Sequence, residues 1–213
     1  MTTPTDLLNA ELRADGARPF LTFYDDSTGE RVELSVATTA NWVAKTANYL
    51  EEHGVEEGIV VSVRLPLHWQ TAIIILATWA AGGIVSFSAD GDLSFAGEED
   101  AGGDCHVLTF EPMGADFSRL VAAQPDQFVP TAPTGDDVVA ATATDLPHGA
   151  RVLTTIGYDV PGGLGYALIG PLAVSGSAVL VRHPDPARLS AHAEAERVSH
   201  TLGVTVPGYP RLD

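Results

Sequence analysis

The sequence predicts an α/β fold with mainly parallel sheets flanked by helices. Strand-like runs and helical patterns alternate along the chain, which is typical of this fold class. Residues 59–65 (IVVSVRL) form a buried strand pattern, followed by a helical pattern from about residue 67 to 81 and a short strand at 84–87. Short connections between strand, helix and strand imply a parallel pair with a crossover. With 213 residues and 45% hydrophobic content, the chain can bury a sizeable core.

The first elements are read from turns and periodicity. The runs FLTFY and RVELS surround the turn DDSTGE and predict a hairpin within residues 20–34. From Ser35, apolar or small residues recur three and four positions apart and predict a helix, with Gly54 at its C-terminal cap. Residues 88–104 are acidic and loop-like, 106–110 indicate a strand, and 116–123 indicate a short helix.

The uncharged stretch from Leu65 to Ala89 invites comparison with a membrane span. Gly82 and Gly83 end its helical part after about 15 residues, or roughly 22 Å, whereas the hydrocarbon layer is about 30 Å thick. We therefore expect a helix buried against a sheet. The N-terminus lacks a basic segment followed by an apolar one, so we expect a cytoplasmic protein.

The second half begins after a Pro-rich stretch. We expect residues 1–123 to form a first α/β subdomain, 124–137 a connector, and 138–213 a second α/β segment that packs on the first. The alternative is one continuous domain. Strands are predicted at 138–141, 151–154, 178–181 and 203–206. Helices are predicted at 163–174 and 185–199, the latter opened by Asp185 and Pro186.

Charge excludes two classes of partner. The chain carries 28 acidic and 11 basic residues, a net charge of -17, which repels nucleic acids and anionic membranes. Its single cysteine, Cys105, excludes an internal disulfide and is expected to be a buried structural residue.

Two blocks carry a family resemblance. The run from Glu33 to Ser88 (ELSVATTANWVAKTANYLEEHGVEEGIVVSVRLPLHWQTAIIILATWAAGGIVSFS) is similar to the opening of AMP-forming acyl-CoA synthetases. The run from Gly157 to Gly208 (GYDVPGGLGYALIGPLAVSGSAVLVRHPDPARLSAHAEAERVSHTLGVTVPG) resembles the stretch after that family's phosphate loop. The whole chain looks like a short actinobacterial family that resembles only the N-terminal part of these ligases. The resemblance implies a truncated N-terminal portion of the adenylate-forming ligase fold.

The resemblance also implies where chemistry should be found. The family's phosphate loop, rich in Gly, Ser and Thr and containing a Lys, would follow a strand between residues 138 and 150. Residues 138–149 (VVAATATDLPHG) supply Thr142 and Thr144 but only one Gly and no Lys. Lys45, the only lysine, is expected on a solvated helix surface. The family's later motifs would come after residue 213.

These features predict a degenerate, non-catalytic protein that acts as a binding or interaction module. Adenylyl transfer needs positive charges placed against a triphosphate, and an acidic chain without the loop lysine lacks them. We expect no catalytic residue and no cofactor, and we expect a homodimer or a protein partner. The alternatives are a subunit of a split acyl-CoA synthetase or adenylating ligase, and a sensor of nucleotide or acyl ligands. Only these alternatives would use ATP, AMP or CoA.

If a pocket survives, six residues are candidates for its wall. Tyr158 and Asp159 match the aromatic-Asp pair that lines the substrate pocket in some amino-acid-activating relatives, although Asp159 can equally cap the following helix. The other candidates are Gly162, Gly163, Thr142 and Thr144. Gly162, Gly163 and Gly165 are typical of ordinary helix initiation and also suit a residual phosphate or acyl pocket.

Two histidines and a glutamate are candidate metal ligands. His192, Glu196 and His200 are spaced four apart and would share one face of a continuous helix. The helix is predicted to end near Ser199 and no fourth ligand is in view, so no metal site is expected. His53 and His68 lie near predicted helix ends, where surface positions are expected.

Overall fold

The computed structural model describes residues 1–97, 106–108, 115–142 and 144–212. The chain divides into two compact units, each made of several segments. Unit 1 contains residues 1–9, 38–66 and 70–136, and unit 2 contains residues 10–37, 67–69 and 137–213. The last change of unit falls between Asp136 and Asp137, at the end of the Pro-rich connector.

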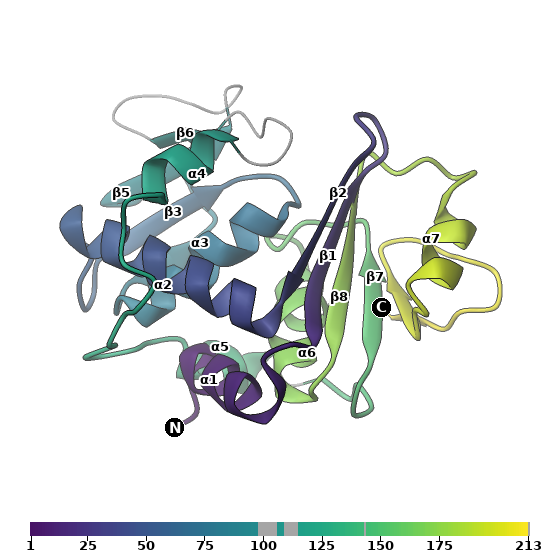
Figure 1. Cartoon of the computed structure of the whole chain (residues 1–213), viewed down its shortest axis with the longest axis horizontal. Coiled ribbons are helices and arrows are strands. Elements are labelled where there is room, and N and C mark those ends of the chain that lie inside the picture. Colours follow the sequence, from purple (N-terminus) through teal and green to yellow (C-terminus); the bar gives the residue numbers. More distant parts are fainter. Residues whose placement is uncertain (98–105, 109–114, 143, 213) are drawn as a thin grey trace. The chain divides into compact units, whose positions relative to one another are not determined.

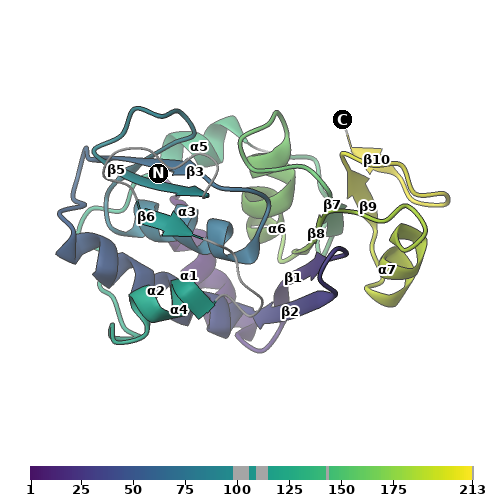
Figure 2. The same cartoon turned by 90° about the horizontal axis from the view of Figure 1, so that it is seen from above.

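Unit 1 is built on a parallel four-stranded sheet with the order β4-β3-β5-β6. Its strands are β3 (Val60–Arg64), β4 (Ile84–Ser86), β5 (Leu93–Gly97) and β6 (His106–Leu108). The helices that lie mostly in this unit are α2 (Val36–Glu52), α3 (Trp69–Ala80) and α4 (Ala115–Val121). Figures 1 and 2 show α2 and α4 side by side, and the rings of Trp42 and Phe117 are 5.7 Å apart. The predicted parallel pair of strands around α3 is confirmed, because Val61 pairs with Val85.

Helix α3 is almost entirely buried, with Ile73, Ile74 and Ile75 at 0% exposure. The uncharged stretch is therefore a core helix followed by a strand, as its length predicts. Among the described residues, no helix combines the length and apolar character that crossing a membrane requires. Gly54 has φ +84° just after α2, which is the left-handed conformation expected of its cap.

Unit 2 is built on a six-stranded sheet with the order β10-β9-β7-β8-β1-β2. Its strands are β1 (Pro19–Asp25), β2 (Glu30–Ser35), β7 (Arg151–Thr154), β8 (Ser177–Arg182), β9 (His200–Leu202) and β10 (Arg211–Leu212). The predicted hairpin is confirmed as β1 and β2, the antiparallel pair. Strand β1 also pairs in parallel with β8, so the hairpin joins the later part of the chain in unit 2.

Helices cover both faces of this sheet. On one face, Leu189 and Ala193 of α7 (Leu189–Ala195) pack on Leu153, Val179 and Val181. On the other face, Tyr166 and Val174 pack on Val152 and Leu202. Tyr166 lies within a helix at 165–173, and Val174 directly follows it. Successive side chains of a strand point to opposite faces, so neighbours Val152 and Leu153 enter different cores. The figures show α6 and α7 on opposite sides of β8 (Figures 1 and 2).

The N-terminal helix α1 (Pro4–Asp15) was not assigned from the sequence. The side chain of Asp6 accepts the N–H of Thr3, and the hydroxyl of Thr3 accepts the N–H of Asp6, so the two cap the helix reciprocally. Further along, Arg18 and Glu11 form an ion pair of 2.5 Å, and Ser175 donates to the other oxygen of Glu11. These contacts tie the end of α1 to the turn before β8.

The strand predicted at 138–141 is wrong, because the segment forms helix α5 (Asp136–Ala141). Four apolar residues are too few for periodicity to separate a strand from a helix. Asp136 and Asp137 open the segment, where carboxylates favour a helix N-terminus, and Gly135 before them has φ +86°. The described residues therefore place no strand directly before the expected phosphate loop.

Three other boundaries differ from prediction. The stretch at 88–104 contains strand β5 and is not loop throughout. The helix predicted at 185–199 begins only at Leu189, because the carboxylate of Asp185 accepts the N–H of Ala187 in a turn. It ends before Arg197, whose φ is 51°. The last strands are β9 and β10, and no strand forms at 203–206.

Two predicted surface residues are less exposed than expected. His68 is 0% exposed and its ring lies 4.3 Å from that of Phe23, edge to face. Lys45 is half-buried on α2, and its ammonium donates to the carbonyl oxygen of Gln124 at 2.5 Å. The expectation for Cys105 falls outside the described residues.

Candidate functional site

The candidate site is a pocket of about 410 Å³ in unit 2. It lies between the end of α5 and residues 159–166, which follow β7 in the chain. Its volume lies within the range of small-molecule sites. The wall is formed by two short segments of the chain. Its lining residues are Ala141, Thr142, Thr144, Asp159, Val160, Pro161, Gly162, Leu164, Gly165 and Tyr166.

Four of the six residues proposed from the sequence line this pocket: Thr142, Thr144, Asp159 and Gly162. The other two lie outside the lining. Tyr158 is buried at 3% exposure, and Gly163 packs against the chain, where an added Cβ would come within 1.9 Å of the carbonyl oxygen of Gly157. A role in binding stays a prediction for all six. The pocket residues Val160, Leu164 and Tyr166 were not proposed from the sequence, because nothing in their spacing distinguishes them from core residues.

Glycines let the two walls approach each other. An added Cβ at Gly165 would lie 3.3 Å from the Cβ of Thr142, and one at Gly170 would lie 2.7 Å from the hydroxyl oxygen of Thr144. The hydroxyl of Thr142 donates to the carbonyl oxygen of Val138 at 2.6 Å, which fixes it to α5. Thr142 and Thr144 are therefore held against the helix that follows the pocket.

That helix begins as a π-helix, η3 (Gly165–Ile169), and continues as α6 (Gly170–Ala173). The N–H of Gly170 donates to the carbonyl oxygen of Gly165, five residues earlier. Single π turns are uncommon and are frequent at functional sites. Here the wide turn starts at the pocket wall, and Gly162, with φ +80°, bends the chain into it.

The pocket wall combines polar and apolar residues and includes one carboxylate. Asp159 is its only ionisable acid, and the lining includes neither lysine nor arginine. The hydroxyl groups of Thr144 and Tyr166 can form hydrogen bonds. Val160, Pro161 and Leu164 provide apolar surface. This arrangement suits a ligand that is neutral or positively charged and carries an apolar body.

Tyr158 stands directly before the pocket residue Asp159. Burial raises the pKa of its hydroxyl well above the usual range. Among the residues that the structure describes, no hydrogen-bond partner faces that hydroxyl. A buried unpaired hydroxyl costs roughly 1–3 kcal/mol, so this tyrosine is held in place by packing against that cost.

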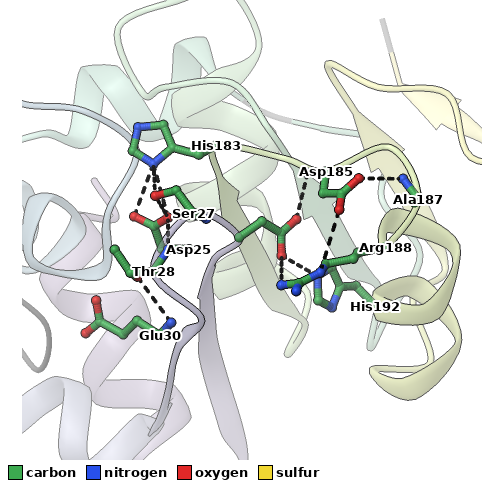
Figure 3. A network of polar contacts seen from close by, with 10 residues as sticks. Asp25, Ser27, Thr28, Glu30, His183, Asp185, Ala187, Arg188 and His192 are labelled. Atoms are coloured by element: carbon green, nitrogen blue, oxygen red, sulfur yellow. Dashed lines mark hydrogen bonds and ion pairs between the residues drawn. The ribbon is translucent and has the colours of Figure 1, made fainter.

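A polar network fills the corner between the β1–β2 turn and the end of β8 (Figure 3). The Nδ1 atom of His183 lies 3.1 Å from the buried carboxylate of Asp25, which also accepts the Ser27 hydroxyl at 2.6 Å. Both Asp25 and the serine approach the same nitrogen of the histidine, so the three do not form a nucleophile–base–acid relay. Ser27 and His183 together lower the pKa of Asp25 and outweigh its burial. The network joins strand ends.

The three candidate metal ligands, His192, Glu196 and His200, each contact different residues. His192 contacts the carboxylate of Asp26 at 2.9 Å (Figure 3). Glu196 binds Arg151 and Tyr24, and His200 lies on β9 beside Ser199. The described part of the chain contains no group of three or more His, Cys, Asp and Glu side chains that could hold a metal ion.

Comparison with known proteins identifies the family. No family model matches the sequence. A "TIGR03089 family protein" of Mycobacterium tuberculosis (strain ATCC 25618 / H37Rv) is 35% identical over 243 residues, which cover 95% of this chain and 100% of the relative. The chain belongs to the TIGR03089 family.

The fold of this TIGR03089 family member is that of the N-terminal part of acyl-CoA synthetases. The inhibitor-bound N-terminal domain of FACL13 from Mycobacterium tuberculosis matches with a TM-score of 0.77 at 12% identity, over 100% of this chain and 67% of that one. Acyl-CoA synthetase from Brucella canis matches with a TM-score of 0.76 at 17% identity, over 95% of this chain and 47% of its own. A benzoate CoA ligase from Burkholderia xenovorans LB400 matches with a TM-score of 0.74 at 16% identity, over 99% and 53%.

The chain thus spans about half the length of these two ligases. In another crystal form, the FACL13 domain is covered to 63%. The predicted fold, a portion of the adenylate-forming ligase fold, is confirmed. At these identities the likeness establishes the fold alone.

Proposed function

We propose that this TIGR03089 family member is a non-catalytic relative of adenylate-forming ligases and acts as a binding module. The observation that carries the proposal is the charge of the pocket wall, which has one carboxylate and no lysine or arginine. Adenylyl transfer requires cationic groups against a triphosphate and its metal ion. Asp159 instead repels a phosphate that approaches this wall.

The local fold supports the same proposal. The segment expected to carry a phosphate loop contains the short helix α5, and residues 142–149 contain one Gly and no Lys. The single lysine of the chain, Lys45, is engaged with the carbonyl oxygens of Ala122 and Gln124 in unit 1. Among the described residues, no cation is therefore supplied to the pocket by its own lining. We expect no ATP, AMP or CoA to bind there.

The ligand we propose is a small molecule with an apolar body and a neutral or cationic polar end. Val160, Pro161 and Leu164 would contact the body, and Asp159 and Thr144 would contact the polar end. Of the aromatic-Asp pair noted in the sequence, only Asp159 lines the pocket. No catalytic step is assigned to any of these residues.

Binding is tested with matched ligands that differ in charge. An alkyl amine, the corresponding primary amide and the corresponding carboxylate are titrated calorimetrically into the protein. We expect the carboxylate to bind most weakly, and Asp159→Asn to reduce that difference, whereas Asp145→Asn, outside the pocket, leaves it unchanged. Val160→Trp fills the pocket and abolishes binding of all three, while Val129→Trp, at a position that is 83% exposed in unit 1, serves as the size-matched control. Tighter binding of the carboxylate would refute the proposed charge preference.

A nucleotide outcome would favour the alternatives. If Mg-ATP or AMP binds the protein and Val160→Trp removes that binding, the pocket still serves nucleotide chemistry, as in a sensor or a split synthetase. If none of these compounds binds, the pocket has neither the proposed ligand preference nor a nucleotide function.

Association with a second copy of the chain is the other part of the proposal. In the four-stranded sheet, β4 is an outer strand, and its Ile84 is 48% exposed. Outer strands of parallel sheets are normally covered, because an open edge can pair with another chain. We expect a dimer by light scattering that Ile84→Lys weakens and Val129→Lys does not. A monomer at tens of micromolar wild-type protein would contradict this.

A further inference from the structure

Unit 1 contains a pair of histidines that no part of the proposed function uses. His53 lies just after α2, and His106 opens β6. Their ring centres are 5.2 Å apart and their planes are 81° from parallel. The ring of His106 also stacks on Phe95 at 5.1 Å, which leaves one of its sides against the core.

A single tyrosine holds both rings. The Nδ1 atom of His53 lies 2.7 Å from the carbonyl oxygen of Tyr49, and the Nδ1 atom of His106 lies 3.0 Å from the hydroxyl of Tyr49. A carbonyl oxygen only accepts, so Nδ1 of His53 carries the proton. In its neutral form His53 therefore has a lone pair on Nε2. His106 can take the same tautomer, because the tyrosine hydroxyl can accept as well as donate.

We propose that His53 and His106 together bind a divalent transition-metal ion, with zinc as the representative. Imidazole nitrogen suits zinc, copper and nickel and does not suit calcium or magnesium. A metal–nitrogen bond of about 2.0–2.1 Å places each ring centre about 3.2 Å from the ion, and two rings at a tetrahedral angle then stand about 5.2 Å apart. At the observed separation of 5.2 Å, a single ion can reach both rings without a change in their spacing.

The surroundings favour such an ion. Histidines that bind metals usually donate the other ring N–H to a carbonyl or a second polar group, and Tyr49 provides that support for both rings. Tyr49 is itself fixed, at 7% exposure. Unit 1 contains fifteen acidic residues against three basic ones, so its field attracts cations. The described residues supply two ligands to the ion, and the bound ion would connect the end of α2 to β6.

The test is a zinc titration of untagged, chelator-treated full-length protein, followed by calorimetry and thermal unfolding. We expect one zinc ion per chain, and a rise in the unfolding midpoint of roughly 3 °C or more at ten times the dissociation constant. Binding weakens as the pH falls, because protons compete with the metal ion for the ring nitrogens.

Variants assign the binding to this pair. His53→Ala abolishes the zinc-dependent rise and does not disturb the core, because His53 is exposed. Tyr49→Phe keeps the carbonyl contact but removes the hydroxyl beside His106, and should weaken affinity about tenfold. His148→Ala, an exposed histidine of unit 2, is the matched control and should leave binding unchanged. If His53→Ala binds zinc like the wild type, or if the wild type binds none at about 1 mM zinc, the proposal is wrong. The pocket of unit 2 takes no part in this result.

Discussion

Glu196 is the acceptor at the centre of an ion network that fastens α7 to the sheet of unit 2. Its carboxylate binds Arg151 on β7, Arg31 on β2 at 3.0 Å, and the hydroxyl of Tyr24 on β1. The side chain of Glu196 is 8% exposed and that of Arg151 is 15% exposed. Replacing Glu196 with alanine leaves the charge of Arg151 largely buried without its counter-ion.

The expected loss of unfolding free energy for Glu196→Ala is about 3 kcal/mol, at the lower end for a broken buried ion pair. We choose the lower end because Arg151 keeps hydrogen bonds to Thr22 and Ser177. For a chain of this size, that loss lowers the thermal midpoint by roughly 6–12 °C. Urea unfolding followed by circular dichroism measures the change directly.

The pH dependence gives a second readout. Burial raises the pKa of Glu196, but the hydrogen bonds from Tyr24, Arg31 and Arg151 outweigh it, so the net pKa is lowered. A carboxyl with a lowered pKa in the folded state stabilises the fold above its unfolded pKa of about 4.5, and this contribution is lost as the pH falls below that value. Glu196→Gln should remove this part of the acid sensitivity. Glu194→Gln, an exposed neighbour on α7, is the control. A loss below about 1 kcal/mol for Glu196→Ala would refute the argument that the network is a buried one.

Three further predictions concern other parts of the chain. Arg197 has φ 51° and an exposed side chain, so Arg197→Gly should raise the free energy of unfolding by about 1 kcal/mol, whereas Arg197→Ala should not, as chemical denaturation will measure. Gly163→Ala should destabilise the protein by at least about 2 kcal/mol, because its Cβ would lie 1.9 Å from a backbone oxygen; a thermal midpoint equal to that of the wild type would contradict this. Burial and the nearby charge of His53 lower the pKa of His106, so in zinc-free protein stability should fall as the pH drops below about 6.5, and His106→Gln should flatten that part of the profile.

Much of the fold follows from sequence pattern because its signals are long. Helices α2 and α3, strand β3 and the β1–β2 hairpin all have periodicity or turn chemistry that a sequence displays. The pairing of β1 with β8 was not predictable in the same way, because it joins residues more than 150 positions apart. The helix α5 was missed since its four apolar residues fit a buried strand equally well.

The candidate site was predictable only in part. Asp159 and Gly162 stood out through the family resemblance and local turn chemistry, and both line the pocket. The neighbours Val160, Leu164 and Tyr166 also line it, and nothing in their spacing distinguishes them from core residues. The histidine pair of unit 1 joins positions 53 and 106 through Tyr49, and this juxtaposition arises only from the packing of α2 on β6.

The most direct test of the central claim is ATP–pyrophosphate exchange by the purified protein with Mg-ATP and a panel of fatty and aromatic acids, alongside calorimetric titration of Mg-ATP alone. We expect no acid-dependent exchange and no heat of nucleotide binding at millimolar ATP, for the wild type and for Val160→Trp alike. Acid-dependent exchange that Val160→Trp abolishes would contradict it and show that the pocket supports adenylation.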